Sequence, residues 1–340
     1  MARLLRSTII ASCLAYFTVC IVAGMEVNHT LHQAMIIFFL SFGLIVLVRY
    51  LVLIVAAICE KLVYEKASYR NDSREGWAPF VSIIVPAFNE EELIAAALTS
   101  LINLDYPNFE IIVVDDGSTD GTLCIAQKIV DRYPGKRIRI ISQSNAGKSW
   151  ALNTGIVHAQ GEFIVCVDSD SKLNINALRA GINHFQDPRV GAIGGFVDII
   201  NTSKLITRLQ QLEYLIGLNF IRRGLSLFNI VTVVPGPIGM FRKEAILQVG
   251  AYNTLSDCFA EDADLTVRLL AAGWRVQGET RMIAKTEAPE TLYSLLRQRY
   301  RWKRGIFQAC FNNLFNLDRY RGYQYDTLFG RITKYSKRIL

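Results

Sequence analysis

Phe109-Glu110-Ile111-Ile112-Val113-Val114-Asp115-Asp116-Gly117-Ser118 joins a run that is apolar apart from Glu110 to a pair of carboxylates and a turn. The run 109–114 predicts a buried strand. A similar run, 163–167, is followed by Asp168-Ser169-Asp170. Strands that are apolar on both faces belong to parallel sheets, and ligands bind at the carboxyl ends of such strands. We therefore expect the two acidic segments to lie together at one edge of a sheet.

Strand and helix patterns alternate on both sides of this stretch. Apolar runs predict further strands at 80–87, 138–141 and 231–234, and helical spacing marks 90–104, 122–133, 147–158, 175–185, 203–227 and 262–272. Parallel strands need crossover helices between them. The sequence thus predicts an α/β fold with a mostly parallel sheet and helices on both faces.

Two long apolar segments precede this domain and explain much of the 51% hydrophobic content. Residues 7–24 hold no charge, and 34–59 are interrupted only by Arg49; each run is near the roughly 20 residues that span a bilayer. We predict two transmembrane helices. The first run could instead be a signal peptide, but no small-x-small cleavage site follows it and a second span comes at once. Arg49 either serves a site within the membrane or marks the cytoplasmic end of its helix.

The distribution of charge predicts topology and partners. The linker 25–33 has no Lys or Arg, and basic residues flank the pair of spans, namely Arg3, Arg6, Lys61, Lys66, Arg70 and Arg74. The positive-inside rule then leaves both ends cytoplasmic, in a multi-pass protein of the plasma (inner) membrane. The net charge of +7 suits an anionic membrane face or a phosphorylated substrate. Nucleic acid is disfavoured because the basic residues gather in the tail.

The predicted organisation has four parts: a membrane region 1–60, a cytoplasmic linker 61–79, the α/β domain 80–290, and basic amphipathic interfacial helices 291–340. Seven cysteines without C-x-x-C spacing indicate reduced thiols rather than disulfides or zinc.

The acidic segments carry oxygen ligands at the strand ends. Asp168 and Asp170 are spaced to bind Mg²⁺ or Mn²⁺ together with substrate phosphates, although turns use the same residues. Two adjacent negative charges, Asp115 and Asp116, are unfavourable at a sheet terminus unless they bind hydrogen-bond donors or a cation. Alternatively, the two residues form only a turn.

Three further segments are candidates for the site. Residues Ala87, Asn89 and Glu90 end the first predicted strand, where Asn89 and Glu90 either cap a helix or reach a nucleoside. Gly147-Lys148-Ser149 is no phosphate loop of the Walker type, because Ser142 stands where that motif needs glycine. Lys148 at a helix N-terminus can still meet an anion, or remain a solvated lysine.

Two segments nearer the C-terminus complete the set. Glu261-Asp262 opens a predicted helix. The two acidic side chains either interact favourably with the helix dipole, or one of the carboxylates acts as a general base. Gln298, Arg301 and Trp302 lie on a later helix. That helix either rests at a membrane surface or presents Arg301 to a departing diphosphate and Trp302 to a sugar ring.

Together, Val113-Val114-Asp115-Asp116-Gly117-Ser118, Asp168-x-Asp170, Glu261-Asp262 and Gln298-Arg299-Tyr300-Arg301-Trp302 resemble the family 2 processive glycosyltransferases, which include cellulose, chitin, hyaluronan and poly-N-acetylglucosamine synthases. The resemblance covers 80–304 and implies a GT-A domain fused to membrane helices. By matching motif, the resemblance implies that Asp115 or Asp116 binds uridine and that Asp168 and Asp170 bind the diphosphate and its metal. Asp262 would be the base, with Glu261 beside it. Gln298, Arg301 and Trp302 would line the donor and acceptor gate, and the turn that starts at Gly236 would contact the acceptor.

The resemblance further implies inverting transfer of a sugar from a UDP-sugar donor to a polysaccharide acceptor at the lipid bilayer. The residues at 236–242 and 287–292 resemble the N-acetylglucosamine-using synthases more than cellulose synthase, which favours N-acetylglucosamine as the sugar. The alternatives are a hyaluronan- or cellulose-type synthase that uses another UDP-sugar, and a non-catalytic nucleotide-sugar-binding assembly subunit. Ala260 stands where many members have Thr. Relatives also carry more membrane helices after the Gln-x-x-Arg-Trp motif, so we expect either a longer chain or an export or channel partner subunit.

Overall fold

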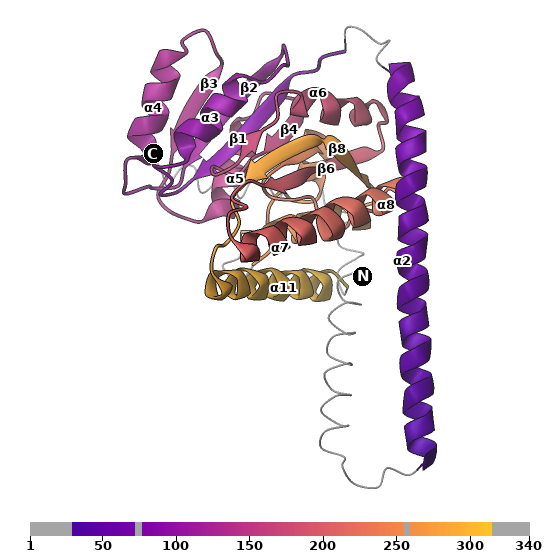
Figure 1. Cartoon of the computed structure of the whole chain (residues 1–340). Coiled ribbons are helices and arrows are strands. Elements are labelled where there is room, and N and C mark those ends of the chain that lie inside the picture. The colour runs from indigo at the N-terminus through magenta and orange to yellow at the C-terminus, as the bar shows by residue number, and fades with distance from the viewer. Residues whose placement is uncertain (1–28, 72–76, 255–258, 315–340) are drawn as a thin grey trace. The chain divides into compact units, whose positions relative to one another are not determined.

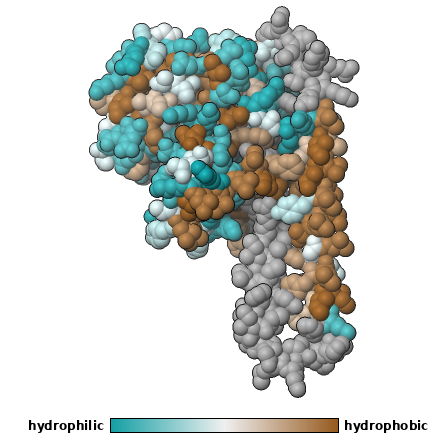
Figure 2. Space-filling view, viewed as in Figure 1, coloured by the Kyte–Doolittle hydropathy of each residue, from teal (hydrophilic) through white to brown (hydrophobic). Residues whose placement is uncertain are grey.

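The computed structural model describes residues 29–71, 77–254 and 259–314, and the chain divides into two compact units, 1–56 and 57–340. Helix α2 (His29–Asn71) contains an apolar segment, Met35–Leu62, that is long enough to cross a membrane. Its side chains are largely exposed, for example Leu40 at 69% and Leu44 at 60%, and Figure 2 shows them as a brown column. Of the two predicted spans, only this one falls in the described part; the run 7–24 lies outside it.

An eight-stranded sheet organises the second unit, in the order β3-β2-β1-β4-β7-β6-β8-β5. Its strands are β1 (Val81–Ala87), β2 (Phe109–Asp115), β3 (Ile138–Ser142), β4 (Phe163–Cys166), β5 (Lys172–Leu173), β6 (Val190–Ile199), β7 (Gly239–Arg242) and β8 (Arg275–Thr286). Strands β3, β2, β1 and β4 are parallel, as are β6 and β8. Strand β7 lies antiparallel between β4 and β6, and β5 is antiparallel to β8. The sheet is therefore mixed and mostly parallel.

Helices cover both faces because the strands bury alternate side chains in opposite directions. Val81, Ile83 and Val85 pack on one side with helices α3 (Ile94–Ile102), α4 (Thr122–Arg132) and α6 (Ala177–Ile182). Ile84 packs on the other with α5 (Lys148–His158), α9 (Lys243–Gln248) and α10 (Glu261–Ala271). Fully burying one such side chain stabilises the fold by about 1.5–3 kcal/mol.

A second group of helices packs near strands β6 and β8. The predicted helix 203–227 is observed as α7 (Leu205–Glu213), a π-helical segment η2 (Tyr214–Phe220) and α8 (Ile221–Leu227). Figure 1 shows α7 running alongside α11 (Leu292–Leu314), and an ion pair of 2.7 Å between Glu213 and Arg299 joins them.

Three expectations about the elements change. Helix α6 begins at Ala177 and passes into a 3-10 turn, η1 (Asn183–Gln186). The predicted strand at 231–234 is a loop, held by Val231 N–H donating to the Val276 carbonyl at 3.0 Å. Strands β6, β7 and β8 fill the sheet where the sequence predicted none.

Candidate active site

The turns after β1 and β2 interlock at the carboxyl end of the sheet. Asn89 has a left-handed backbone with φ of 54°, and its side-chain oxygen accepts the Thr119 N–H at 2.9 Å. The Asn89 N–H donates to Ser118 Oγ at 3.1 Å, and the Glu90 N–H donates to Thr122 Oγ1 at 2.7 Å. Asn89 thus joins the two turns.

Asp116 anchors the loop that leads into α5. Its carboxylate accepts the Gly147 N–H at 2.7 Å, the Ala146 N–H at 3.0 Å and Gln143 Nε2 at 2.6 Å, and only 3% of the residue is exposed. Its own N–H donates to the Ala87 carbonyl at 2.9 Å. These bonds satisfy both oxygens of a buried carboxylate, so Asp116 fixes the position at which α5 begins.

Asp115 and Ala87 are also buried, at 4% and 2% exposed. Asp115 Oδ1 lies 3.4 Å from the Ser118 N–H. The turn needs glycine at 117, where φ is 73° and a Cβ would lie 2.8 Å from the Asn145 backbone nitrogen. Ala87 offers the turn its backbone carbonyl rather than its side chain.

Lys148 bridges the two acidic motifs that follow β4 and open α10. Its ammonium lies 2.6 Å from Asp168 Oδ1 and 3.3 Å from Glu261 Oε1. Burial alone would lower the pKa of Lys148, but the two carboxylates outweigh that effect and raise it. A Cβ on Gly236 would stand 3.2 Å from the ammonium and 3.3 Å from Asp168 Oδ2, so the turn at Gly236 covers this pair closely.

Carboxylates crowd beside this bridge. Burial and then the neighbouring Asp168 raise the pKa of Asp170, whose Oδ1 accepts from Ser171 Oγ at 2.8 Å. Burial, and then Asp170 and Asp168, raise the pKa of Glu90. The negative charges therefore repel one another in a partly desolvated place, which a divalent cation would relieve.

The donor set fits a hard cation only in part. Within residues 29–71, 77–254 and 259–314 no three His, Cys, Asp or Glu side chains are arranged to hold a metal ion by themselves. Asp168 and Asp170 offer two carboxylates, and Mg²⁺ commonly takes one or two and fills its shell with water and substrate phosphates. The residues present thus fit a metal that arrives with a phosphorylated ligand.

Glu261 and Asp262 stand at the first turn of α10. Burial would raise the pKa of Glu261, but Lys148 and then Arg301 lower it below its ordinary value, so Glu261 is a carboxylate at neutral pH. Asp262 Oδ1 accepts the Ala263 N–H at 2.7 Å. Thr266 ties this helix to the loop before β7, because its Oγ1 accepts the Val234 N–H at 2.9 Å.

Helix α11 approaches the start of α10 through Gly305. A Cβ at this position would lie 2.5 Å from the Ala260 nitrogen and 2.6 Å from Ala260 Cβ. This contact places the cationic helix at the carboxylate pair, and Arg301 acts electrostatically on Glu261. The small side chain of Ala260 is what the approach requires.

Gln298 and Trp302 form a neighbouring cluster organised by Arg299, which the sequence interpretation did not single out. The Arg299 guanidinium lies 4.4 Å from the centre of the Trp302 ring and donates to Gln298 Oε1 at 2.9 Å. Trp302 packs on the buried cluster of Val197, Ile199, Tyr214 and Ala288. Only the place of Arg299 inside the quoted Gln-Arg-Tyr-Arg-Trp stretch could have signalled it.

The structure thus brings most predicted site residues together. Eight of them are linked by contact or charge: Glu90, Lys148, Asp168, Asp170, Gly236, Glu261, Asp262 and Arg301. Gln298 and Trp302 belong to the adjoining cluster. Two more buried groups lie behind the carboxylates without any motif to mark them. Burial raises the pKa of the Cys166 thiol to about 12, and its partner Tyr252 has its own pKa raised by burial and by Cys166.

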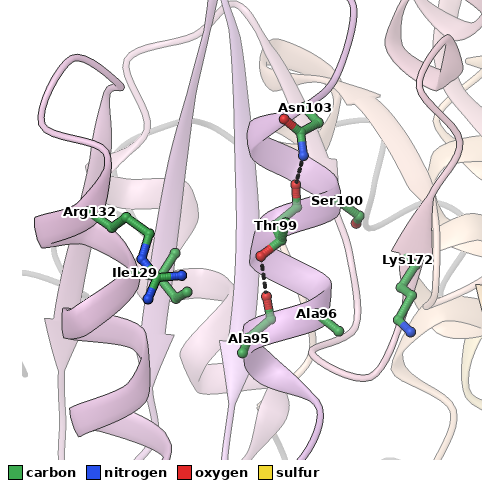
Figure 3. A pocket seen from close by; sticks show the side chains of 8 residues that line it. All are labelled: Ala95, Ala96, Thr99, Ser100, Asn103, Ile129, Arg132 and Lys172. Carbon is green, nitrogen blue, oxygen red and sulfur yellow. Dashed lines mark hydrogen bonds between the residues drawn. The ribbon is translucent and has the colours of Figure 1, made fainter.

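A groove of about 490 Å³ lies elsewhere, between α3, α4 and β5 (Figure 3). None of the predicted site residues lines it. Its lining is Ala95, Ala96, Thr99, Ser100, Asn103, Ile129, Arg132 and Lys172.

A covered α/β sheet with carboxylates at the ends of β1, β2 and β4, faced by an acidic pair on α10, defines a GT-A-like fold. The mannosyltransferase PcManGT of Pyrobaculum calidifontis, solved in complex with GDP-Man and Mn²⁺, shares this fold with a TM-score of 0.57 and 24% identity, over 77% of this chain and 76% of its own.

Residues 82–250 match the family described as Glycosyl transferase family 2. Poly-beta-1,6-N-acetyl-D-glucosamine synthase of Staphylococcus aureus (strain COL) is 31% identical over 253 residues, which are 74% of this chain. The synthase of the same name from Staphylococcus epidermidis is 31% identical over 66% of this chain. The chain belongs to glycosyl transferase family 2. The matched regions span 60% and 54% of those two synthases.

Proposed function

We propose that the chain is a membrane-bound inverting glycosyltransferase that adds N-acetylglucosamine from a UDP-sugar to a growing β-linked polysaccharide. The bridge from Asp168 through Lys148 to Glu261 carries this proposal, because it joins a candidate ligand of the diphosphate and its metal to the residue next to Asp262, the candidate base. The choice of sugar is supported by the likeness to the poly-N-acetylglucosamine synthases.

In the proposed reaction Asp262 accepts the proton of the acceptor hydroxyl, whose oxygen attacks the anomeric carbon from the face opposite UDP. Glu261 keeps its charge beside Lys148 and Arg301, and so sustains the field in which Asp262 acts as base. Lys148 and Arg301 meet the negative charge that develops on the leaving diphosphate. Asp115 and Glu90 contact the nucleoside, while Asn89 and Asp116 hold the turns that present them.

Asp168 and Asp170 would hold Mg²⁺ or Mn²⁺, which supplies charge neutralisation at the diphosphate when bound. Trp302, fixed by Arg299 and Tyr214, lines the acceptor side with Gln298. The polymer, the bilayer and an export partner are the other components that this function needs. The catalytic unit faces the cytoplasm, where the UDP-sugar is.

The test is UDP release by the detergent-purified full chain from UDP-N-acetylglucosamine, UDP-glucuronate and UDP-glucose, each with Mn²⁺, Mg²⁺ or EDTA. We expect metal-dependent release with UDP-N-acetylglucosamine. Asp262→Asn should keep UDP binding and lower turnover at least about a hundredfold, as expected for loss of a general base. Asp131→Asn, at an exposed carboxylate of α4, is the matched control.

Release with another donor would replace the proposed sugar, and unchanged turnover of Asp262→Asn would remove that residue as the base. UDP binding without release from any donor would favour the non-catalytic nucleotide-sugar-binding role.

A further inference from the structure

The ammonium of Lys148 forms an ion pair with Asp168 and so compensates the negative charge of that carboxylate. It lies 2.6 Å from Asp168 Oδ1, while Oδ2 faces the turn at Gly236, where even a methyl group would come within 3.3 Å. One oxygen of this carboxylate is therefore bonded to the ammonium, and the other lies near the backbone at Gly236. Mg²⁺ binds a carboxylate oxygen at about 2.1 Å. An ammonium that is already bonded to the same oxygen opposes such a close approach of a second cation.

The second contact of Lys148 decides where the ammonium can go. Glu261 Oε1 lies 3.3 Å away on a different element, the first turn of α10. Lys148 itself is the first residue of α5, and the loop before it is fixed by the bonds to Asp116. When Asp168 is lost as a partner, the side chain thus remains tethered beside the catalytic pair through Glu261.

We infer that Lys148 is an internal counter-ion of Asp168 that exchanges with the metal: on donor loading it leaves Asp168 to the cation and pairs with the incoming diphosphate while it stays held by Glu261. This inference rests on the proposed function for the nature of the donor. Lys148 acts as a positioning residue for Asp168 in the empty site and as a diphosphate contact in the loaded site.

The exchange predicts that Lys148 weakens the binding of the metal alone and strengthens the binding of the nucleotide. With Lys148 in place, a cation alone meets a like charge near Asp168, so it binds weakly. A cation that arrives with a diphosphate brings the anion that draws the ammonium away. Metal and nucleotide should therefore bind with strong positive coupling, and each should raise the affinity for the other by the same factor.

The experiment measures Mn²⁺ binding by the electron paramagnetic resonance signal of the free ion, with detergent-purified full chain, first alone and then with UDP. For Lys148→Met we expect Mn²⁺ alone to bind about tenfold more tightly, because a like charge near the site is gone. UDP in the presence of Mn²⁺ should bind about tenfold more weakly, because a charge-assisted contact to the diphosphate is lost. The coupling between the two ligands should shrink accordingly.

Two variants serve as controls. Lys172→Met removes an exposed lysine close in sequence to the same acidic triplet and should leave both affinities as in the wild type. Lys148→Arg keeps the charge and should keep the weak binding of Mn²⁺ alone. If Lys148→Met is poorly folded, Lys148→Gln makes the same measurement with a polar side chain.

Unchanged Mn²⁺ affinity in Lys148→Met, with weaker UDP binding, would reduce Lys148 to a plain diphosphate contact and overturn the exchange. Weaker binding of both ligands would overturn it too, since that is the result of a site that has merely lost its shape. The donor sugar plays no part in these measurements. A wrong assignment of the transferred sugar therefore shows separately, in the wild-type UDP release.

Discussion

Individual buried charges hold the backbone on which the site depends, and the pair Asp264 and Arg268 shows how. Arg268 Nε donates to Asp264 Oδ2 at 2.8 Å, and both side chains are 6% exposed. The Arg268 Nη1 also donates to the Val249 carbonyl at 2.5 Å. The pair therefore ties α10, which carries Asp262, to the end of α9.

We predict that Arg268→Met destabilises the protein by about 3 kcal/mol or more, because it leaves a buried carboxylate without its cation. The midpoint of thermal unfolding in detergent, followed by tryptophan fluorescence, should fall by roughly 5–10 °C. Arg132→Met, at an exposed arginine of α4, should shift it little. A midpoint equal to that of the wild type would show that the pair contributes nothing net to stability.

At the scale of whole elements, Gly305 sets the distance between α11 and α10. The methyl group of an alanine there would overlap the Ala260 backbone nitrogen at 2.5 Å, and backbone atoms cannot move aside as a flexible side chain can. Helix α11 would have to shift outward, carrying Arg301 away from Glu261. The two helices thus pack tightly against each other although 260 and 305 are far apart in sequence.

We predict that Gly305→Ala lowers sugar transfer at least about tenfold while UDP binding at the strand ends changes little. A helix displaced by even an ångström misplaces groups that act on the reacting atoms. Gly135→Ala is the matched control, because a Cβ at 135 meets nothing within 4 Å. Transfer at the wild-type rate in Gly305→Ala would mean that α11 need not approach α10 so closely.

The sequence predicted elements well where one residue pattern determined them. Apolar runs located β1 through β4, and helical spacing located α3, α4, α5 and α10 within a few residues. Strand β6 escaped prediction because it holds three glycines that local pattern treats as breaks. They are there for tertiary reasons: a Cβ on Gly191 would meet Trp274 at 2.8 Å, and one on Gly195 would meet the Met282 carbonyl at 2.5 Å.

The same distinction holds for the site. Acidic motifs at strand ends identified Asp168 and Asp170 as candidates, because parallel topology alone brings such residues to one edge. Glu261 was a candidate as one of two acidic residues that open a helix. The bridge made by Lys148 could not be predicted, since it depends on where α10 packs after a long chain excursion. The part that Arg299 plays behind Trp302 likewise depends on Glu213, which lies on α7.

At the scale of the whole molecule, the arrangement of charges around the apolar runs predicts how the chain crosses the membrane. Helix α2 supplies one segment long enough to do so, Met35–Leu62, and Lys66 and Arg70 follow it. The linker 25–33 has no basic residue, whereas Arg3 and Arg6 precede the first run. Orientation follows the basic residues near each end of a span, so both flanks should face the cytoplasm.

Reporter fusions to the full chain test this topology. Alkaline phosphatase inserted after residue 27 should be active, because the short linker would face outward, and after residue 71 it should be inactive. An N-terminal fluorescent protein should stay covalently attached to the membrane-bound chain and fluoresce on the cytoplasmic side. If the first run were instead a cleaved signal peptide, that N-terminal tag would be missing from the chain recovered in membranes, while both phosphatase results would stay the same. The N-terminal tag therefore separates two spans from one, and the fusion after residue 71 reports by itself whether the carboxylates, Lys148 and Arg301 face the cytoplasm.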